Sequence, residues 1–203
     1  MDLDAKPTLV AGILSDTHIP YRMKRLPQAV LDGLKDVDLV LHAGDVDKPE
    51  ALAPLWKIAP VHAVRGNVHV LDLSSGGASL PRSIELHLAG RRVLVTHGHL
   101  PGLLGLWLKG RDVMLRLLDR DEKQRFNQRI ACRLVSLYPD ADVIVFGHTH
   151  RAHVEWLGDT LLINPGAVCP TFRELPSIAR MTLGGDMPQV QIIPLDIGRR
   201  RVP

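Results

Sequence analysis

Five short apolar runs in this chain end in side chains that can bind divalent metals, often beside a glycine. The five endings are Asp16-Thr17-His18, Gly44-Asp45, Gly66-Asn67, His97-Gly98-His99 and Gly147-His148-Thr149-His150. Carboxylate, amide and imidazole groups are metal ligands, and a glycine lets the backbone turn sharply without a Cβ clash. Any one of these five endings occurs by chance in many proteins. The ordered set of five predicts a metal site.

Convergence of these run ends would bring seven donors into one pocket. The seven are Asp16, His18, Asp45, Asn67, His97, His148 and His150. Seven ligands are too many for one tetrahedral zinc but suit two ions of higher coordination. Nitrogen and oxygen donors without a thiolate favour Mn, Fe or Zn over a soft metal. Alternation along the chain would point His148 and His150 to opposite faces of a strand, so we expect their loop to bend.

The apolar pattern predicts the elements that must position these donors. Continuous apolar runs predict buried strands at 9–14, 37–41, 61–64 and 143–146, and helical patterns occur at 26–34 and 51–58. The later half predicts three hairpins, at 84–88 with 93–96, 154–157 with 161–163, and 178–183 with 190–193. Strand–helix units followed by hairpins favour a layered α/β (α+β) domain with mixed sheets. In such a sheet, strand ends deliver their loops to one edge, where ligand sites form.

The segment between His99 and Tyr138 differs from the rest of the chain. It opens with an apolar stretch and continues as a charged helical pattern in which Phe126, Ile130 and Leu134 recur every fourth residue. We interpret it as a helical insertion of about 100–138 within a single domain spanning 1–203. The amphipathic helix is expected to pack on its own core. The alternatives are a lid over the site or a subunit contact, which would make a homodimer plausible.

Composition narrows the class of protein. The chain has 203 residues, of which 45% are hydrophobic and 23% charged, and a formal net charge of +3. The basic run at 199–201 holds much of that excess, so binding to nucleic acid is not expected. The chain has two cysteines far apart in sequence, Cys132 and Cys169. One disulfide between them is an alternative, but their spacing suggests a reducing compartment. The first residues include acidic side chains where a secretory signal would have basic ones. No apolar run approaches the roughly 18 residues that a membrane span requires. We therefore expect a cytoplasmic protein without a membrane partner.

The chain resembles the calcineurin-like metallophosphoesterases and, within them, the small bacterial and archaeal phosphodiesterases of the YfcE type. The resemblance rests on the five endings above and on Asn164-Pro165-Gly166, and extends from about residue 9 to residue 170. It implies a four-layer sandwich of two mixed β-sheets flanked by helices. It also implies the ligand sets: Asp16, His18 and His150 for one metal, Asn67, His97 and His148 for the second, and Asp45 bridging both.

The resemblance further implies a reaction. Two divalent ions, with Mn expected first and Fe, Zn or Ni as alternatives, would clamp a phosphate ester and activate a bridging hydroxide for attack. The two ions, two aspartates and one hydroxide leave a site charge of about +1, which suits an anionic substrate. Asn67 is a neutral ligand and leaves that charge in place, so we also count it as a catalytic residue. The expected partner is a small phosphate ester.

One position departs from the family pattern. Many phosphatases of this superfamily have a histidine after Gly-Asn that helps to protonate the leaving group, whereas this chain has Val68. His69 or His99 could replace that acid, and each could instead have only a structural role in its loop. Loss of a general acid costs about 10²- to 10⁴-fold in rate. We therefore expect a preference for diesters with acidic leaving groups, such as aryl or cyclic phosphates.

Two other functions stay open for a chain with these motifs. A non-catalytic scaffold of this fold binds proteins, as the retromer vacuolar sorting subunit does, but it can lose metal ligands, whereas all seven positions here are donors. A nuclease of the superfamily tends to be longer and to have DNA-binding parts. A zinc peptidase is disfavoured because the sequence has no His-Glu-x-x-His.

Overall fold

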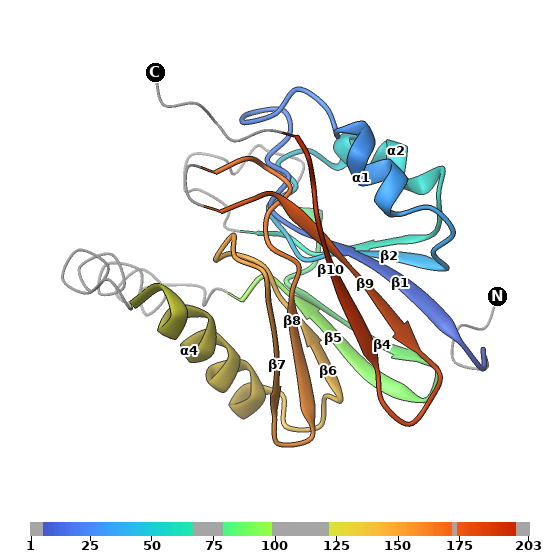
Figure 1. Cartoon of the computed structure of the whole chain (residues 1–203), viewed down its shortest axis with the longest axis vertical. Helices are drawn as coiled ribbons and strands as arrows, with labels where there is room; N and C mark the ends of the chain where they lie inside the picture. Colours follow the sequence, from blue (N-terminus) through green and yellow to red (C-terminus); the bar gives the residue numbers. More distant parts are fainter. Residues whose placement is uncertain (1–5, 67–78, 99–121, 172–173, 198–203) are drawn as a thin grey trace.

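The chain forms two five-stranded mixed β-sheets that pack face to face (Figure 1). The computed structural model describes residues 6–66, 79–98, 122–171 and 174–197. The first sheet has the order β10-β9-β1-β2-β3, from β1 (Leu9–Leu14), β2 (Leu39–His42), β3 (Val61–Ala63), β9 (Ser177–Leu183) and β10 (Gln189–Pro194). The second has the order β4-β5-β6-β8-β7, from β4 (Ser83–Leu88), β5 (Arg91–Thr96), β6 (Val143–Val145), β7 (His153–Leu157) and β8 (Thr160–Asn164).

Parallel strands deliver the metal-binding motifs to one edge of this structure. Strands β1, β2 and β3 pair in parallel, as do β5, β6 and β8. The remaining strands pair antiparallel in the three predicted hairpins, β4–β5, β7–β8 and β9–β10, and β9 joins its hairpin to β1. Since parallel strands end at the same edge, the loops after β1, β2, β5 and β6 emerge together.

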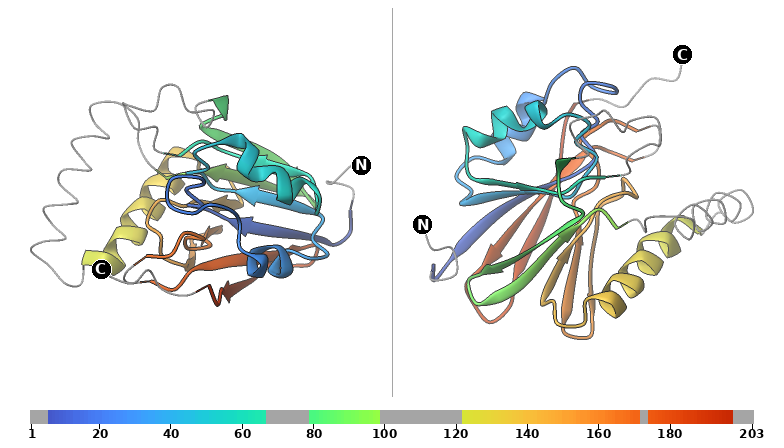
Figure 2. Two further views of the ribbon diagram at one scale, coloured as in Figure 1. Left: turned by 90° about the horizontal axis from the view of Figure 1, so that it is seen from above. Right: turned by 180° about the vertical axis from the view of Figure 1, so that it is seen from behind.

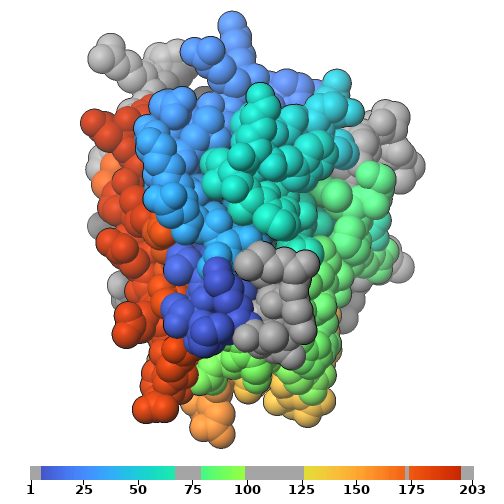
Figure 3. All heavy atoms as spheres, turned by 90° about the vertical axis from the view of Figure 1, so that its right-hand side faces the viewer, coloured from blue at the N-terminus to red at the C-terminus, as the bar shows by residue number. Residues whose placement is uncertain are grey.

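Three clusters of buried apolar side chains divide the fold into four layers. One lies between the sheets and includes Ile13 and Val95, one lies between the first sheet and the short helices, and the third lies between the second sheet and α4. Figure 2 shows these helices on opposite outer faces. In Figure 3 the blue and cyan segment fills the upper part of the visible face, and red atoms of the C-terminal part border it on the left. The predicted four-layer sandwich is confirmed.

The helices of the first layer are shorter than the sequence pattern predicts. The expected helix 26–34 is α1 (Gln28–Gly33), and the expected helix 51–58 is a 3₁₀ turn, η1 (Pro49–Leu52), followed by one α-helical turn, α2 (Ala53–Trp56). The cause is Pro54, which has no N–H and is tolerated only in the first turn of an α-helix. The prediction of a continuous helix through Pro54 was therefore wrong.

Helix α4 (Glu122–Leu137) is amphipathic, as predicted. Phe126, Ile130 and Leu134 are buried in the cluster beneath it. A lid or a subunit contact remains a prediction, and residues 99–121 of the proposed insertion lie outside the described residues. Among the described helices, none has the length and apolar character needed to cross a membrane.

Candidate metal centre

The ligand-bearing loops are tied to one another through their backbones. The Asp16 amide donates to the Gly44 carbonyl over 2.9 Å, and the His18 amide donates to the Asp45 carbonyl over 3.0 Å. The loop after β6 joins them, because the His148 amide donates to Asp16 Oδ2 over 3.2 Å. These bonds fix where the donor side chains lie relative to each other.

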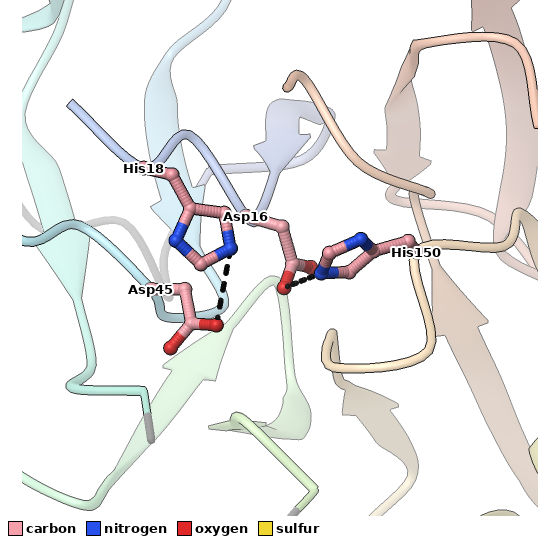
Figure 4. Close-up of side chains that lie close together, drawn as sticks. All are labelled: Asp16, His18, Asp45 and His150. Atoms are coloured by element: carbon pink, nitrogen blue, oxygen red, sulfur yellow. Dashed lines mark ion pairs between the residues drawn. The ribbon is translucent and has the colours of Figure 1, made fainter. Parts of the chain in front are cut away.

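Four side chains form a compact donor group (Figure 4). Asp16, His18, Asp45 and His150 each offer one ligand atom, and these atoms lie within 4.8 Å of one another. His18 Nε2 lies 3.3 Å from Asp45 Oδ2, and His150 Nε2 lies 3.0 Å from Asp16 Oδ1. Within the described part of the chain, Asp16 Oδ1 and His18 Nε2 are buried without a hydrogen bond. A cation would satisfy both atoms, so the group fits a metal ion.

Asp45 extends this group toward two further histidines. Its Oδ1 lies 3.4 Å from His97 Nε2, while its Oδ2 faces His18. The His97 ring lies 5.2 Å from the His148 ring, and His97 Nδ1 lies 2.7 Å from the Ala43 carbonyl. An Nδ1–H donated to that carbonyl makes Nε2, which faces Asp45, the nitrogen that would bind a metal.

The structure therefore brings six of the seven predicted ligands into one connected cluster. The seventh, Asn67, lies outside the described residues, as do His69 and His99.

The pKa values of buried groups show that this edge favours positive charge. Burial alone would lower the pKa of His97, but the carboxylates of Asp45 and Asp16 and the Ala43 carbonyl raise it to about 9. Burial alone would raise the pKa of Asp16, but the close contact with His150 and the charge of its ring outweigh burial, so the pKa of Asp16 lies below the ordinary 3.8. Near pH 7 His97 is therefore protonated without a metal, and a divalent ion bound at Nε2 would replace that proton.

Five of the predicted ligands have a left-handed backbone. The φ angles are 54° at Asp16, 49° at His18, 58° at Asp45, 72° at His148 and 60° at His150. For a residue with a Cβ this conformation costs about 1–2 kcal/mol. At His148 and His150 it produces the bend that the sequence required for both imidazoles to reach the site.

Close packing of neighbouring atoms explains why two motif positions are glycine. A Cβ at Gly66 would lie 1.7 Å from Asp45 Oδ1 and 2.3 Å from the Asp45 amide nitrogen. At Gly44, which has a φ of +98°, a Cβ would lie 2.5 Å from His97 Nδ1. Any side chain at either position would therefore displace a predicted ligand.

A hydrogen-bond network that the sequence did not reveal supports the His148–His150 loop. The Thr149 hydroxyl donates to Asn127 Oδ1 on α4 over 2.6 Å and accepts from Asn164 Nδ2 over 3.0 Å. Asn164 Nδ2 also donates to the Gly147 carbonyl over 2.9 Å. Of these residues, only Asn164 stood out in the sequence, through its Asn-Pro-Gly turn. Asn127 could not be found, because nothing local tells which loop faces that side of α4.

His42 is a buried histidine with a structural role. Its Nδ1 accepts from the Gly44 amide over 3.2 Å, and its Nε2 lies 3.3 Å from Thr17 Oγ1. Thr17 Oγ1 in turn donates to the Asp45 carbonyl over 3.3 Å. Burial lowers the pKa of His42 to about 4, so the ring is neutral near pH 7. It supports the ligand loops and does not belong to the donor group.

Comparison with known proteins agrees with this geometry. The family model described as the calcineurin-like phosphoesterase superfamily domain matches residues 9–186. The chain is 34% identical over 187 residues to a probable metallophosphoesterase of Methanothermobacter thermautotrophicus, covering 91% of this chain and 92% of the relative. It is 31% identical over 157 residues to the probable metallophosphoesterase YsnB of Bacillus subtilis, covering 77% and 75%.

Solved structures share the fold at lower identity. Vacuolar protein sorting 29 of Cryptosporidium parvum superposes with a TM-score of 0.65 at 24% identity, covering 95% of this chain and 94% of that one. A predicted phosphoesterase of Streptococcus pneumoniae superposes with a TM-score of 0.59 at 19% identity, covering 96% and 97%.

Proposed function

Because this chain belongs to the calcineurin-like phosphoesterase superfamily, we propose that it is a metal-dependent phosphodiesterase acting on a small phosphate ester. The observation that carries the proposal is the position of Asp45, whose two carboxylate oxygens face His18 on one side and His97 on the other. A carboxylate shared between two sets of donors suits a pair of neighbouring cations.

The proposed ligands fall into two sets that share Asp45. Asp16, His18 and His150 complete the first set, and His97, His148 and Asn67 complete the second. The first is supported by the compact donor group and the second by the contacts of His97 with Asp45 and His148. Manganese is the ion we expect, with Fe, Zn or Ni as alternatives, because every donor is nitrogen or oxygen.

Each residue then has a role in hydrolysis. When bound, two divalent ions would supply an activated water and positive charge for the phosphate. Asp45 holds the two donor sets together, and the neutral Asn67 leaves the site positive toward an anionic substrate. Val68 cannot transfer a proton, so protonation of the leaving group falls to His69, to His99 or to solvent.

The decisive experiment is a metal-by-substrate screen on the purified protein. The chelator-treated protein is reloaded with Mn²⁺, Fe²⁺, Zn²⁺ or Ni²⁺ and assayed on bis-p-nitrophenyl phosphate. Asp45→Asn should lower turnover by more than about 10²-fold, because outer-shell partners alone cost about 10- to 100-fold. The control is Asp159→Asn, the same chemical change on an exposed residue of the β7–β8 turn, which should keep full activity. Equal activity of the two variants would contradict the proposal.

The expected substrate preference has its own test. Without the family's histidine at position 68, bis-aryl diesters should be cleaved faster than alkyl monoesters, whose leaving groups need protonation. His69→Ala and His99→Ala should each be assayed on both substrates. A variant that loses activity only on the poor leaving group identifies the acid. Faster cleavage of alkyl monoesters by the wild type would contradict the preference.

A non-catalytic scaffold is the rival function, since structures of vacuolar protein sorting 29 share the fold. The likeness to them concerns the fold alone, whereas each of the seven ligand positions here has a donor side chain. Metal content and turnover of the purified protein separate the two, because a scaffold needs neither. A cytoplasmic location and a homodimer remain predictions.

A further inference from the structure

The His18 imidazole lies between two carboxylates. Its Nε2 faces Asp45 Oδ2 at 3.3 Å, within the compact donor group, and its Nδ1 faces Asp47 Oδ1 at 3.5 Å, on the other side of the ring. The side chains of His18 and Asp47 are only 9% and 16% exposed, so water screens this pair little. None of the sequence motifs included Asp47.

The backbone holds Asp47 in this position. His18 donates its amide to the Asp45 carbonyl, and Ile19 forms an isolated parallel bridge with Asp47, so the loops after β1 and β2 run side by side past the ring. Asp47 has a left-handed φ of 61°, which costs less for aspartate than for most residues. Within the described residues its Oδ2 is buried without a hydrogen bond. A left-handed, partly buried aspartate with one such atom requires an explanation.

A neutral imidazole has one N–H and one lone pair, and its neighbours decide which nitrogen has which. Asp45 favours the proton on Nε2 and Asp47 favours it on Nδ1, so removing Asp47 should shift the proton toward Nε2. With the proton on Nδ1, the Nε2 lone pair points at the donor group. Metal-binding histidines commonly have such an outer partner, which fixes both the tautomer and the ring orientation.

We propose that Asp47 is a positioning residue that fixes the His18 ring with Nε2 directed at the donor group. This rests on the metal site of the proposed function, because Asp47 acts on a metal only through His18. A purely local explanation, in which Asp47 only completes its turn, predicts no effect on the His18 tautomer or on metal affinity.

The experiment compares three variants in their affinity for a metal ion and in the tautomer of the His18 imidazole. Affinity for Mn²⁺ is measured by competition with a chelator, and the His18 tautomer is read from imidazole ¹⁵N shifts in the metal-free protein. Asp47→Ala should weaken Mn²⁺ binding by about 10- to 100-fold and lower the Nδ1–H population. Asp47→Asn keeps an acceptor oxygen and tolerates the left-handed backbone, so it should recover most of both. Asp36→Ala is the matched control, since Asp36 has a φ of 58° but is exposed and follows α1.

The two readouts separate this inference from the proposed function. Wild-type Mn²⁺ affinity and an unchanged His18 tautomer in Asp47→Ala would overturn the role of Asp47, even if the enzyme is active. If the wild type binds no Mn²⁺ but the tautomer still shifts in Asp47→Ala, the metal site fails while the effect of Asp47 on the ring stands. Should Asp47→Ala fail to fold, Asp47→Gly replaces it in both measurements, because glycine also removes the carboxylate and tolerates the left-handed φ of 61°.

Discussion

Left-handed backbone positions occur at both edges of the sheets, but different residue types occupy them. At the far edge, the hairpin turns place glycine at the left-handed positions Gly90 (φ +75°) and Gly158 (φ +61°), where a Cβ would find open space. At the ligand edge, glycine also takes left-handed positions such as Gly44 (φ +98°), but others hold aspartate and histidine, including Asp16, Asp45 and His148. Of the eight non-glycine residues with positive φ in the described part, five are predicted ligands and a sixth, Asp47, contacts one.

The difference shows what each edge is selected for. A turn needs only a backbone shape, so the residue that adopts it at least cost is favoured. The ligand loops need donors at fixed points, and the fold compensates for their strain through buried hydrogen bonds elsewhere. We therefore expect the left-handed donors at the ligand edge to lower the free energy of unfolding, and this loss can be measured.

Gly66→Ala should have the largest effect, because it places a Cβ 1.7 Å from Asp45 Oδ1. Asp45 must move, so turnover of bis-p-nitrophenyl phosphate should fall by at least about 10²-fold. The clash should also lower the free energy of unfolding by about 1–3 kcal/mol. Gly185→Ala, which meets nothing within 4 Å, is the control and should change neither quantity appreciably. A fully active Gly66→Ala protein would mean that the loops after β2 and β3 do not pack as described.

His42 tests the role of a histidine at this edge that is not a ligand. Burial lowers its folded pKa from 6.5 to about 4, so its contribution to stability is complete above pH 6.5 and is lost as the pH falls toward 4. The loss should amount to about 3 kcal/mol. Urea unfolding of the metal-free wild type and of His42→Gln over this range isolates the contribution. If both proteins lose stability in parallel, His42 titrates normally and is not the neutral support inferred here.

His148→Gly measures the strain at the ligand edge. Removing the Cβ relieves a left-handed residue of about 1–2 kcal/mol, and the added chain entropy of glycine offsets about 0.5–1 kcal/mol. Metal-free His148→Gly should therefore unfold with a free energy up to about 1.5 kcal/mol higher, but without activity. Ala89→Gly, with a φ of 48° in the β4–β5 turn, should gain similarly and stay active. A clear loss of stability in His148→Gly alone would contradict the idea of stored strain.

The sequence predicted what depends on residue type and spacing. Apolar runs located the strands, glycine marked the hairpin turns, and donors after the runs indicated where the site would form. The break at Pro54 was also present in the sequence and was missed, because the apolar pattern continues across it.

The rest depends on long-range placement. The partners of Asp47 and Asn127 are set by which loops pass each other, and sequence spacing does not contain that information. The left-handed backbone at His148 and His150 was foreseen only as a bend, since sequence spacing does not determine which φ angle produces it.

The smallest predicted effect concerns charge near the two edges. Arg22, Lys24 and Arg25 are exposed on the turn after His18, where the Arg22 amide donates to the His18 carbonyl over 2.8 Å. These cations should attract an anionic diester, so Lys24→Ala should raise KM about 2- to 5-fold at low salt with kcat unchanged. The effect should fade in 1 M salt, where the screening length is about 3 Å. Lys57→Ala removes the same charge from an exposed residue ahead of β3, at the far edge, and should leave KM unchanged. Equal shifts in the two variants would mean that net charge, and not the turn beside the ligand loops, attracts the substrate.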